Sequence, residues 1–276
     1  MGTRLAVLGS PIAHSKSPLL HGAAYAALGL DWRYEAIEVT EDTLAEFVRS
    51  RDASWRGLSL TMPLKKDVLP LLDGRDPVVD VTGAANTVLF ADGLLRGFNT
   101  DVYGVTQAFR DAGVTSLENV QVLGGGATAA SVLAAVVELG ATRITVSVRS
   151  VEKAAALTEL GERLGVEVVV RPLGMQDRSL IVPDAVVSTL PGHADHGVVF
   201  AEAIRRGSVL FDVAYDPWPS TFATAWLGAG GPAISGLEML INQAVAQVRI
   251  FVSGSAAVPL ENESAVLAAM RAAVTP

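Results

Sequence analysis

Three consecutive glycines, Gly124, Gly125 and Gly126, separate a short apolar segment from an alanine-rich segment with helical periodicity. The apolar segment, residues 120–123, predicts a buried strand, and residues 127–139 predict a helix. Glycine adopts positive φ angles without strain and lets a ligand come close to the backbone. A strand, a glycine turn and a helix form the first half of a βαβ unit, whose helix N-terminus can hold a pyrophosphate. By itself, such a turn is also expected of an ordinary connection between a strand and a helix.

The residues after the next predicted strand indicate which nucleotide such a unit would bind. Residues 143–148 predict a second buried strand, and Arg149 and Ser150 follow it. In dinucleotide-binding units, an acidic residue about 20 positions after the glycines binds the ribose 2′-hydroxyl of NAD. This chain has Arg149 there, which can form a bidentate pair with a 2′-phosphate, helped by Ser150 and Lys153. The sequence therefore predicts NADP rather than NAD as the cofactor.

Polar residues also follow the strands predicted in the first part of the chain. Residues 4–8, 32–39 and 57–61 predict strands, and residues 94–98 predict a strand that returns from a turn at Asp92-Gly93. Ligands of open α/β sheets bind beyond the carboxyl ends of the strands. The polar residues expected at such ends are Ser15, Ser17, Lys65, Asn86 and Asp101. Their common location favours one shared pocket.

Local roles are also open to these residues. Ser17 would cap a helix whose first residue is Pro18, and Thr100 or Asp101 would cap the helix predicted over residues 102–112. Pro63 predicts a helix start that puts Lys65 in the first turn, where its charge opposes the helix dipole. We interpret Lys65 as a lysine directed at a ligand rather than a solvated surface lysine.

Composition narrows the class of protein. The chain has 276 residues, half of them hydrophobic, and a formal net charge of −8. The negative charge argues against a nucleic-acid or anionic-membrane surface, and no apolar run reaches the ~18–20 residues of a membrane-spanning helix. Because there are no cysteines and only four histidines, we expect no metal site. These features predict a soluble, cytoplasmic α/β protein with room for two domains.

The order of short motifs resembles the shikimate dehydrogenase family along almost the whole chain. The resembling blocks are Ser15-Lys16-Ser17-Pro18, residues 57–65, 83–87 and 97–101, the glycine turn, and residues 148–150, 212–215 and 236–243. The resemblance implies an N-terminal α/β substrate domain with a mixed, mostly parallel sheet, followed by a Rossmann-type dinucleotide-binding domain. It implies a substrate-binding and catalytic domain over residues 1–101 and an NADP-binding domain over residues 102–254. The C-terminal helix, about residues 255–276, is expected to pack back onto the first domain.

The family's functional residues fall on matching positions of this chain. The resemblance assigns catalysis to Lys65 and Asp101. It assigns substrate binding to Ser15, Ser17, Thr61, Asn86, Tyr215 and Gln243. It assigns cofactor binding to Gly124, Gly125, Gly126, Ala127, Arg149, Ser150, Lys153, Gly236 and Met239.

The activity implied by the resemblance is the reversible NADPH-dependent reduction of 3-dehydroshikimate to shikimate, in the shikimate pathway of chorismate and aromatic amino acid biosynthesis. Reduction of a ring ketone needs a proton donor at the oxygen, and the ammonium group of Lys65 can donate that proton and stabilise the developing charge. Asp101 would hold the ammonium group. The expected partner is this small molecule, with no nucleic acid or membrane, and the protein is expected to be a monomer or homodimer.

Two departures from the family's pattern leave alternatives open. The family often has Asn-Val-Thr where this chain has Ser59-Leu60-Thr61, so a contact between Ser59 and substrate stays open. The glycine turn runs Gly-Gly-Gly-Ala-Thr instead of Gly-Ala-Gly-Gly-Ala, and Val148 replaces an asparagine often found before Arg149. One alternative is a quinate/shikimate dehydrogenase of broader specificity that uses NAD, which an acid after the strand would favour. The other is a non-catalytic NADP-binding regulator, which loss of Lys65 or Asp101 would mark.

Overall fold

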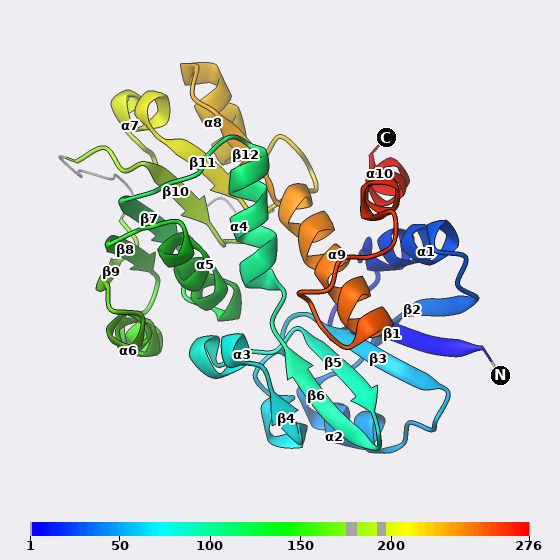
Figure 1. The fold of residues 1–276 in the computed structure, drawn as a ribbon. Coiled ribbons are helices and arrows are strands. Elements are labelled where there is room, and N and C mark those ends of the chain that lie inside the picture. The colour runs from blue at the N-terminus through cyan, green and yellow to red at the C-terminus, as the bar shows by residue number, and fades with distance from the viewer. Residues whose placement is uncertain (1, 175–180, 192–196, 276) are drawn as a thin grey trace. The chain divides into compact units, whose positions relative to one another are not determined.

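The computed structural model describes residues 2–174, 181–191 and 197–275. The chain forms two compact units (Figure 1): Met1–Thr100 together with Ile241–Pro276, and Asp101–Leu240. The long helix α9 (Gly236–Ser253) therefore begins in the second unit and ends in the first. Within the described ranges, none of the helices is long and apolar enough to cross a membrane.

The first unit is built on a six-stranded mixed sheet. The strands lie in the order β2 (Trp32–Glu38), β1 (Thr3–Gly9), β3 (Trp55–Leu60), β5 (Thr87–Ala91), β6 (Leu94–Phe98) and β4 (Gly74–Arg75). β1 runs parallel to β2 and β3, whereas β5 runs antiparallel to β3 and β6. The turn between β5 and β6 has positive φ angles at Asp92 (54°) and Gly93 (75°), as its Asp-Gly pair predicts.

Helices complete the core of this unit. They are α1 (Ser17–Ala27), α2 (Glu41–Arg49), the 3-10 turn η1 (Leu69–Leu71), α3 (Pro77–Thr82), the second half of α9, and α10 (Glu263–Val274). Leu44 and Val48 of α2 pack in one cluster with Leu58 of β3. Phe251 of α9 lies so close to Gly57 that a Cβ there would come within 2.4 Å of its ring. Glycine at position 57 therefore lets α9 approach β3.

The C-terminal helix α10 packs against α1. It is also tied to α9, because the guanidinium of Arg249 donates to both carboxylate oxygens of Glu263, at 2.6 and 2.5 Å. The Arg249 side chain is 11% exposed and that of Glu263 24%. This bidentate pair lowers the pKa of Glu263. It also holds the start of α10 against α9.

The second unit has a six-stranded sheet in which every strand is parallel. The order is β12 (Ala233–Ser235), β11 (Val209–Asp212), β10 (Ala185–Ser188), β7 (Asn119–Leu123), β8 (Arg143–Val148) and β9 (Glu167–Pro172). Counted along the chain, this is the strand order of a doubly wound dinucleotide-binding fold, with β7 as its first strand. The helices are α4 (Asp101–Asp111), α5 (Ala127–Glu138), the 3-10 turn η2 (Glu152–Ala154), α6 (Ala155–Leu164), α7 (Glu202–Gly207) and α8 (Thr221–Ala229).

Aromatic residues join these helices to the parallel sheet. Trp226 of α8 is fully buried in a cluster with Val186 and Leu210 of the sheet. Phe109 of α4 meets Phe211 of β11 edge to face, with ring centroids 5.1 Å apart. Together the two units confirm the predicted fold class, a mixed-sheet α/β domain with a Rossmann-type domain.

The structure corrects two local predictions. The segment that carries Lys65 is a series of turns and not a helix, although Leu64 and Val68 of this segment are fully buried in the core. Helix α1 begins at Ser17 with Lys16 as its N-cap, so Ser17 is not the cap. The elements β4, α3, α7 and β12 were not predicted, since they span only two to six residues and are too short for a periodicity signal.

Candidate functional site

Asn86 lies at the centre of a buried hydrogen-bond cluster in the first unit. Its side chain is held at both ends: Thr87 Oγ1 and the Thr100 N–H donate to Oδ1 at 2.8 and 2.9 Å, and Nδ2 donates to Thr100 Oγ1 at 2.9 Å. Asn86 is 1% exposed. Because the Thr100 N–H can only donate, Oδ1 must face it, and the amide has one orientation.

Gln243 of α9 reaches this cluster from a distant part of the sequence. Its Oε1 accepts from Asn86 Nδ2 and from Thr100 Oγ1, both at 3.4 Å. The fold therefore brings two of the predicted substrate residues, Asn86 and Gln243, into contact.

Thr61 and Lys65 come from the segment that follows β3. The N–H of Thr61 donates to Leu8 O at 2.9 Å, and a Cβ on Gly9 would lie 2.5 Å from Thr61 Cγ2, so glycine permits this approach. Lys65 is half-buried, and its carbonyl accepts from the N–H of Ala85 at 2.8 Å. The backbone of Lys65 is thus fixed to the residue that precedes Asn86.

Ser15 and Ser17 lie at the start of α1. The N–H of Ser17 donates to Ser15 Oγ at 3.3 Å, so the two residues are adjacent in space. Ser15 is half-buried and Ser17 is buried. The Ser17 hydroxyl hydrogen-bonds to Tyr34, whose pKa burial raises far above its ordinary value. Ser17 is therefore partly engaged with the protein rather than a free loop hydroxyl.

The glycine turn of the second unit has a different role at each position. Gly124 has a φ of 106°, and a Cβ there would lie 2.3 Å from Thr189 Oγ1. A Cβ on Gly125 would lie 2.9 Å from Val148 Cγ1, whereas one on Gly126 would meet nothing within 4 Å among the residues that the structure describes. The first two glycines are thus required by the protein itself, and the third leaves open space at the N-terminus of α5.

This helix terminus suits an anionic ligand. Gly126 is the N-cap of α5, with no side-chain cap and no acidic residue in the first turn. The first N–H groups of a helix have no partner within the helix and attract phosphate. Ala127, the first helical residue, is half-buried, and its N–H belongs to this set.

The cations predicted to select NADP follow the neighbouring strand. β8 pairs with β7 in parallel, and the N–H of Gly124 donates to Ser147 O at 2.9 Å. Arg149 and Lys153 are exposed and Ser150 is half-buried. Arg149, Ser150 and Lys153 therefore follow a strand that ends beside the glycine turn. Two cations and a hydroxyl at this position fit a nucleotide with a 2′-phosphate.

Tyr215 follows β11, and Gly236 and Met239 lie in the first turn of α9, which follows β12. Tyr215 is half-buried, and burial raises its pKa, with a smaller contribution from Asp216. A Cβ on Gly236 would lie 2.0 Å from Val213 O, so only glycine lets α9 begin there. Met239, in the first turn of α9, is buried.

Asp101 is the first residue of α4 and is 3% exposed. It belongs to the second unit, as do the glycine turn, Arg149 and Tyr215, whereas Lys65 belongs to the first. The predicted roles of all these residues remain predictions.

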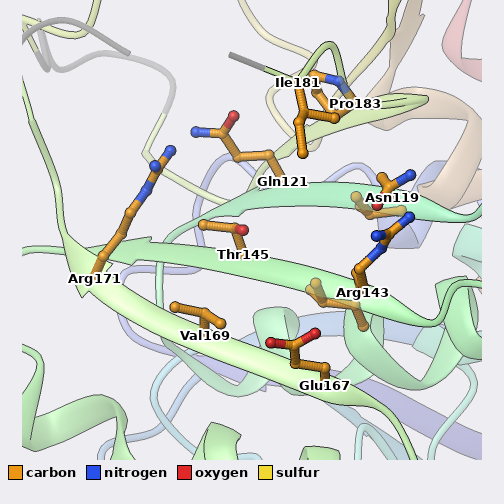
Figure 2. Close-up of a pocket in the computed structure, with 11 residues that line it drawn as sticks. Asn119, Gln121, Arg143, Thr145, Glu167, Val169, Arg171, Ile181 and Pro183 are labelled. Carbon is orange, nitrogen blue, oxygen red and sulfur yellow. The ribbon is translucent and has the colours of Figure 1, made fainter. Parts of the chain in front are cut away.

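A separate pocket of about 160 Å³ lies on one face of the parallel sheet. Figure 2 shows it over β7, β8 and β9, with Gln121, Thr145 and Arg171 among its lining residues. Arg171 donates from Nε to Ser147 Oγ at 3.0 Å. None of the predicted site residues lines this pocket.

Three residues of the cluster around Asn86 were missed by sequence reasoning. Thr100 was interpreted only as a helix cap, and Thr87 and Gln247 were not singled out. Gln247 Nε2 donates to Asn86 O at 3.1 Å and to Thr87 Oγ1 at 3.0 Å. The only signal in the sequence is that Gln247 follows Gln243 by four residues and so shares its helix face.

A fourth missed residue, Asp212, holds the loop that carries Tyr215. Its carboxylate accepts from Ser220 Oγ at 2.6 Å and from the N–H of Ala214 at 3.2 Å. Asp212 is 2% exposed. Its place in the block 212–215 was a usable signal, because an acid at the end of a buried strand needs partners.

Comparison with known proteins gives consistent results. Residues 7–88 match the family model described as the shikimate dehydrogenase substrate binding domain. A relative from Oleidesulfovibrio alaskensis, named shikimate dehydrogenase (NADP(+)), is 35% identical over 253 residues, which cover 89% of this chain and 88% of the relative. A relative of the same name from Methanothermobacter thermautotrophicus is 34% identical over 254 residues, or 89% of each chain.

Solved structures agree over the full length. The crystal structure of Mycobacterium tuberculosis shikimate dehydrogenase is 40% identical and has a TM-score of 0.85, covering 98% of this chain and 99% of that one. The Thermus thermophilus shikimate 5-dehydrogenase, solved in complex with NADP(H) and shikimate, is 30% identical with a TM-score of 0.82, covering 99% of this chain and 100% of that one. The resemblance predicted from short motifs is confirmed, and this chain belongs to the shikimate dehydrogenase family.

Proposed function

We propose that this chain catalyses the reversible reduction of 3-dehydroshikimate to shikimate with NADPH. The observation that carries the proposal is the buried cluster of Asn86, Thr100 and Gln243. Ala85, the residue before Asn86, donates its N–H to the carbonyl of Lys65. Neutral donors and acceptors of this kind suit a polyhydroxylated carboxylate. The names of the two relatives described above, both shikimate dehydrogenase (NADP(+)), support the same activity and cofactor.

The residues of the second unit fit NADP. The N–H groups at the start of α5, beside the open space at Gly126, would hold the pyrophosphate. Arg149, with Ser150 and Lys153, would hold the 2′-phosphate. Gly236 and Met239 are proposed to line the nicotinamide side. When bound, NADPH supplies the hydride, which brings one hydrogen and both electrons to the ring carbon.

The protein's own residues handle the proton and the substrate. Lys65 donates a proton to the ketone oxygen as that oxygen gains negative charge, and it regains a proton from solvent after the reaction. In the oxidation of shikimate, neutral Lys65 accepts the hydroxyl proton. Asp101 is proposed as its carboxylate partner. Substrate orientation is proposed for Ser15, Ser17, Thr61, Asn86, Tyr215 and Gln243.

The proposal describes a cytoplasmic enzyme, a monomer or homodimer, that acts on a small molecule. A spectrophotometric assay of NADPH formation tests it, with shikimate or quinate as substrate and NADP or NAD as cofactor. We expect turnover with shikimate and NADP to exceed every other combination. Dominant activity with quinate and NAD would support the alternative enzyme, and no turnover with any pair would overturn the proposal.

A further inference from the structure

A chain of hydrogen-bonded side chains, buried except for the half-buried Tyr34, runs behind Asn86 in the first unit. It connects Tyr25 and His21 of α1, Gln247 of α9, Ser59 of β3 and Tyr34 of β2. The contacts are Tyr25 OH to His21 Nδ1 (3.0 Å), His21 Nε2 to Gln247 Oε1 (3.1 Å), Ser59 Oγ to Gln247 Oε1 (2.8 Å) and Tyr34 OH to Ser59 Oγ (2.7 Å). His21 and Gln247 are 0% and 2% exposed.

The protons of this chain have one consistent arrangement. The Tyr34 hydroxyl donates to Ser59, and the Ser59 hydroxyl donates onward to Gln247 Oε1. An amide oxygen only accepts, so His21 must carry its proton on Nε2 and accept from Tyr25 on Nδ1. The imidazole is also stacked on Tyr34, with centroids 4.0 Å apart. Burial lowers the pKa of His21 to about 3, which keeps the ring neutral.

The orientation of Gln247 adds a second constraint on the amide of Asn86, whose Oδ1 also accepts from the Thr100 N–H. With Oε1 held by two donors, the amide nitrogen of Gln247 points the other way and donates to Asn86 O and to Thr87 Oγ1. The Thr87 hydroxyl, having accepted that bond, donates to Asn86 Oδ1 at 2.8 Å. Together, the Thr87 hydroxyl and the Thr100 N–H hold Oδ1, which leaves the Nδ2 group of Asn86 facing Thr100 Oγ1 and Gln243.

We propose that Gln247 is a positioning residue for the substrate-binding amide of Asn86, acting through Thr87, and that Ser59 serves this chain rather than the substrate. The inference rests on the proposed function in one respect, namely that Asn86 binds substrate. A hydrogen bond holding a ligand-binding group in one orientation reduces the entropy lost when the ligand binds.

The test compares two buried glutamines. Gln247→Met removes both ends of the amide at similar side-chain length. Gln121→Met is the matched control, because Gln121 of β7 is similarly buried, at 5% exposed, and lies in the other unit. We expect Gln247→Met to raise the KM for shikimate by about tenfold, with the KM for NADP within about twofold of the parent, as for loss of one oriented hydrogen bond. Gln121→Met should leave the KM for shikimate unchanged.

A second variant distinguishes loss of the hydrogen bond to Asn86 from a general folding defect. Thr87→Val removes only the relay hydroxyl and leaves the bonds of Gln247 to His21 and Ser59 in place. We expect a smaller rise in the KM for shikimate, and combining it with Gln247→Met should add little, because both changes break one path. A shikimate KM that stays at the parent value in folded Gln247→Met, or full additivity of the two effects, would overturn the proposal.

A measurement made without substrate tests the hydrogen-bonded chain independently of the proposed function. Nitrogen-15 NMR of the histidines should show His21 as the neutral Nε2–H tautomer in the parent and a changed signal in Gln247→Met. A Nδ1–H tautomer would overturn the proton arrangement whatever the enzyme's substrate. If the tautomer is as expected but the parent protein has no turnover with shikimate, the proposed function has failed and Gln247 has no substrate-binding amide to position, which overturns the role.

Discussion

The two units present their candidate binding residues in opposite ways. In the first unit, Asn86, Thr100 and Gln243 are buried side chains that bond to one another. In the second unit, the glycine turn offers main-chain N–H groups, and the side chains beside it, Arg149 and Lys153, are exposed. A site made of interlocked side chains couples ligand binding to the stability of the core. A site made of backbone and exposed cations separates the two.

The largest expected effect is on catalysis in the first unit. Lys65→Ala should lower kcat about 10³-fold, the scale of losing a general acid. Lys65 is half-buried and its backbone, which the substitution keeps, makes the bond to Ala85. Shikimate affinity, measured by equilibrium titration, should therefore stay within a few-fold. A variant with near-normal kcat would remove Lys65 from the reaction, and Lys66→Ala, at the exposed neighbouring lysine, is the matched control.

The glycine turn should separate stability from cofactor binding. Gly124→Ala puts a Cβ into Thr189 at a positive φ and should destabilise the fold by about 2 kcal/mol or more, as overpacking of a core does. The Cβ of Gly126→Ala has no atom of the described, non-neighbouring residues within 4 Å, so the melting temperature should stay near the parent value while the KM for NADP rises. Calorimetry and steady-state kinetics on both variants check this. If Gly126→Ala leaves the KM for NADP unchanged, no ligand approaches that position closely.

Arg149→Ala should affect one cofactor and not the other. Losing a charge-assisted hydrogen bond of about 1.5–3 kcal/mol predicts a rise of at least about tenfold in the KM for NADP. The KM for NAD, which has no 2′-phosphate, should change little, and the melting temperature should not change because Arg149 is exposed. Equal effects on both cofactors would contradict the assignment, and Arg163→Ala on α6 serves as a control for loss of an arginine.

The last expected effect concerns pH and the hydrogen-bonded chain of the first unit. Because the pKa of His21 is lowered to about 3, the folded state excludes a proton that the unfolded state binds below about pH 6.5. Stability should therefore fall by up to about 1.4 kcal/mol per pH unit as the pH drops from about 6.5 toward 3, and this contribution is absent above that window. Urea unfolding across this range measures the slope.

Two variants test whether His21 causes this dependence of stability on pH: His21→Gln removes the buried histidine, and His14→Gln is the matched control. His14 is exposed, so its replacement should leave the pH dependence as in the parent. His21→Gln should flatten the slope between about pH 6.5 and 5, even though it lowers the stability at neutral pH. An unchanged slope in His21→Gln would show that His21 is protonated in the folded protein.

Several features could be predicted because they depend on residues close in sequence. The strand of residues 120–123, the glycine turn and the following helix are contiguous, and the structure has β7 and α5 there. The Asp92-Gly93 hairpin is encoded by two residues. The short elements β4, α3, α7 and β12 could not be predicted, because pairing with distant strands or packing, rather than local periodicity, stabilises them.

The segment around Lys65 shows where local reasoning fails. Pro63 is a valid helix-start signal, yet the residues after it form turns that hold Leu64 and Val68 in the first core. Ser17 behaves similarly, since its hydroxyl meets Tyr34, which no local pattern relates to it. Tertiary packing supplies more free energy than the few tenths to about 1 kcal/mol that a cap or propensity contributes.

The sequence by itself determined the family and the two α/β sheets, and it predicted NADP because Arg149 stands where an acidic residue would indicate NAD. Each of these depends on short motifs of residues that are neighbours in the sequence. Only the tertiary structure decided that Gln247, His21 and Ser59 form one hydrogen-bonded chain behind Asn86. The physical reason is that a glutamine on a helix is ordinarily solvated, and a partner 161 positions away in the sequence becomes its neighbour only when α9 packs on the sheet.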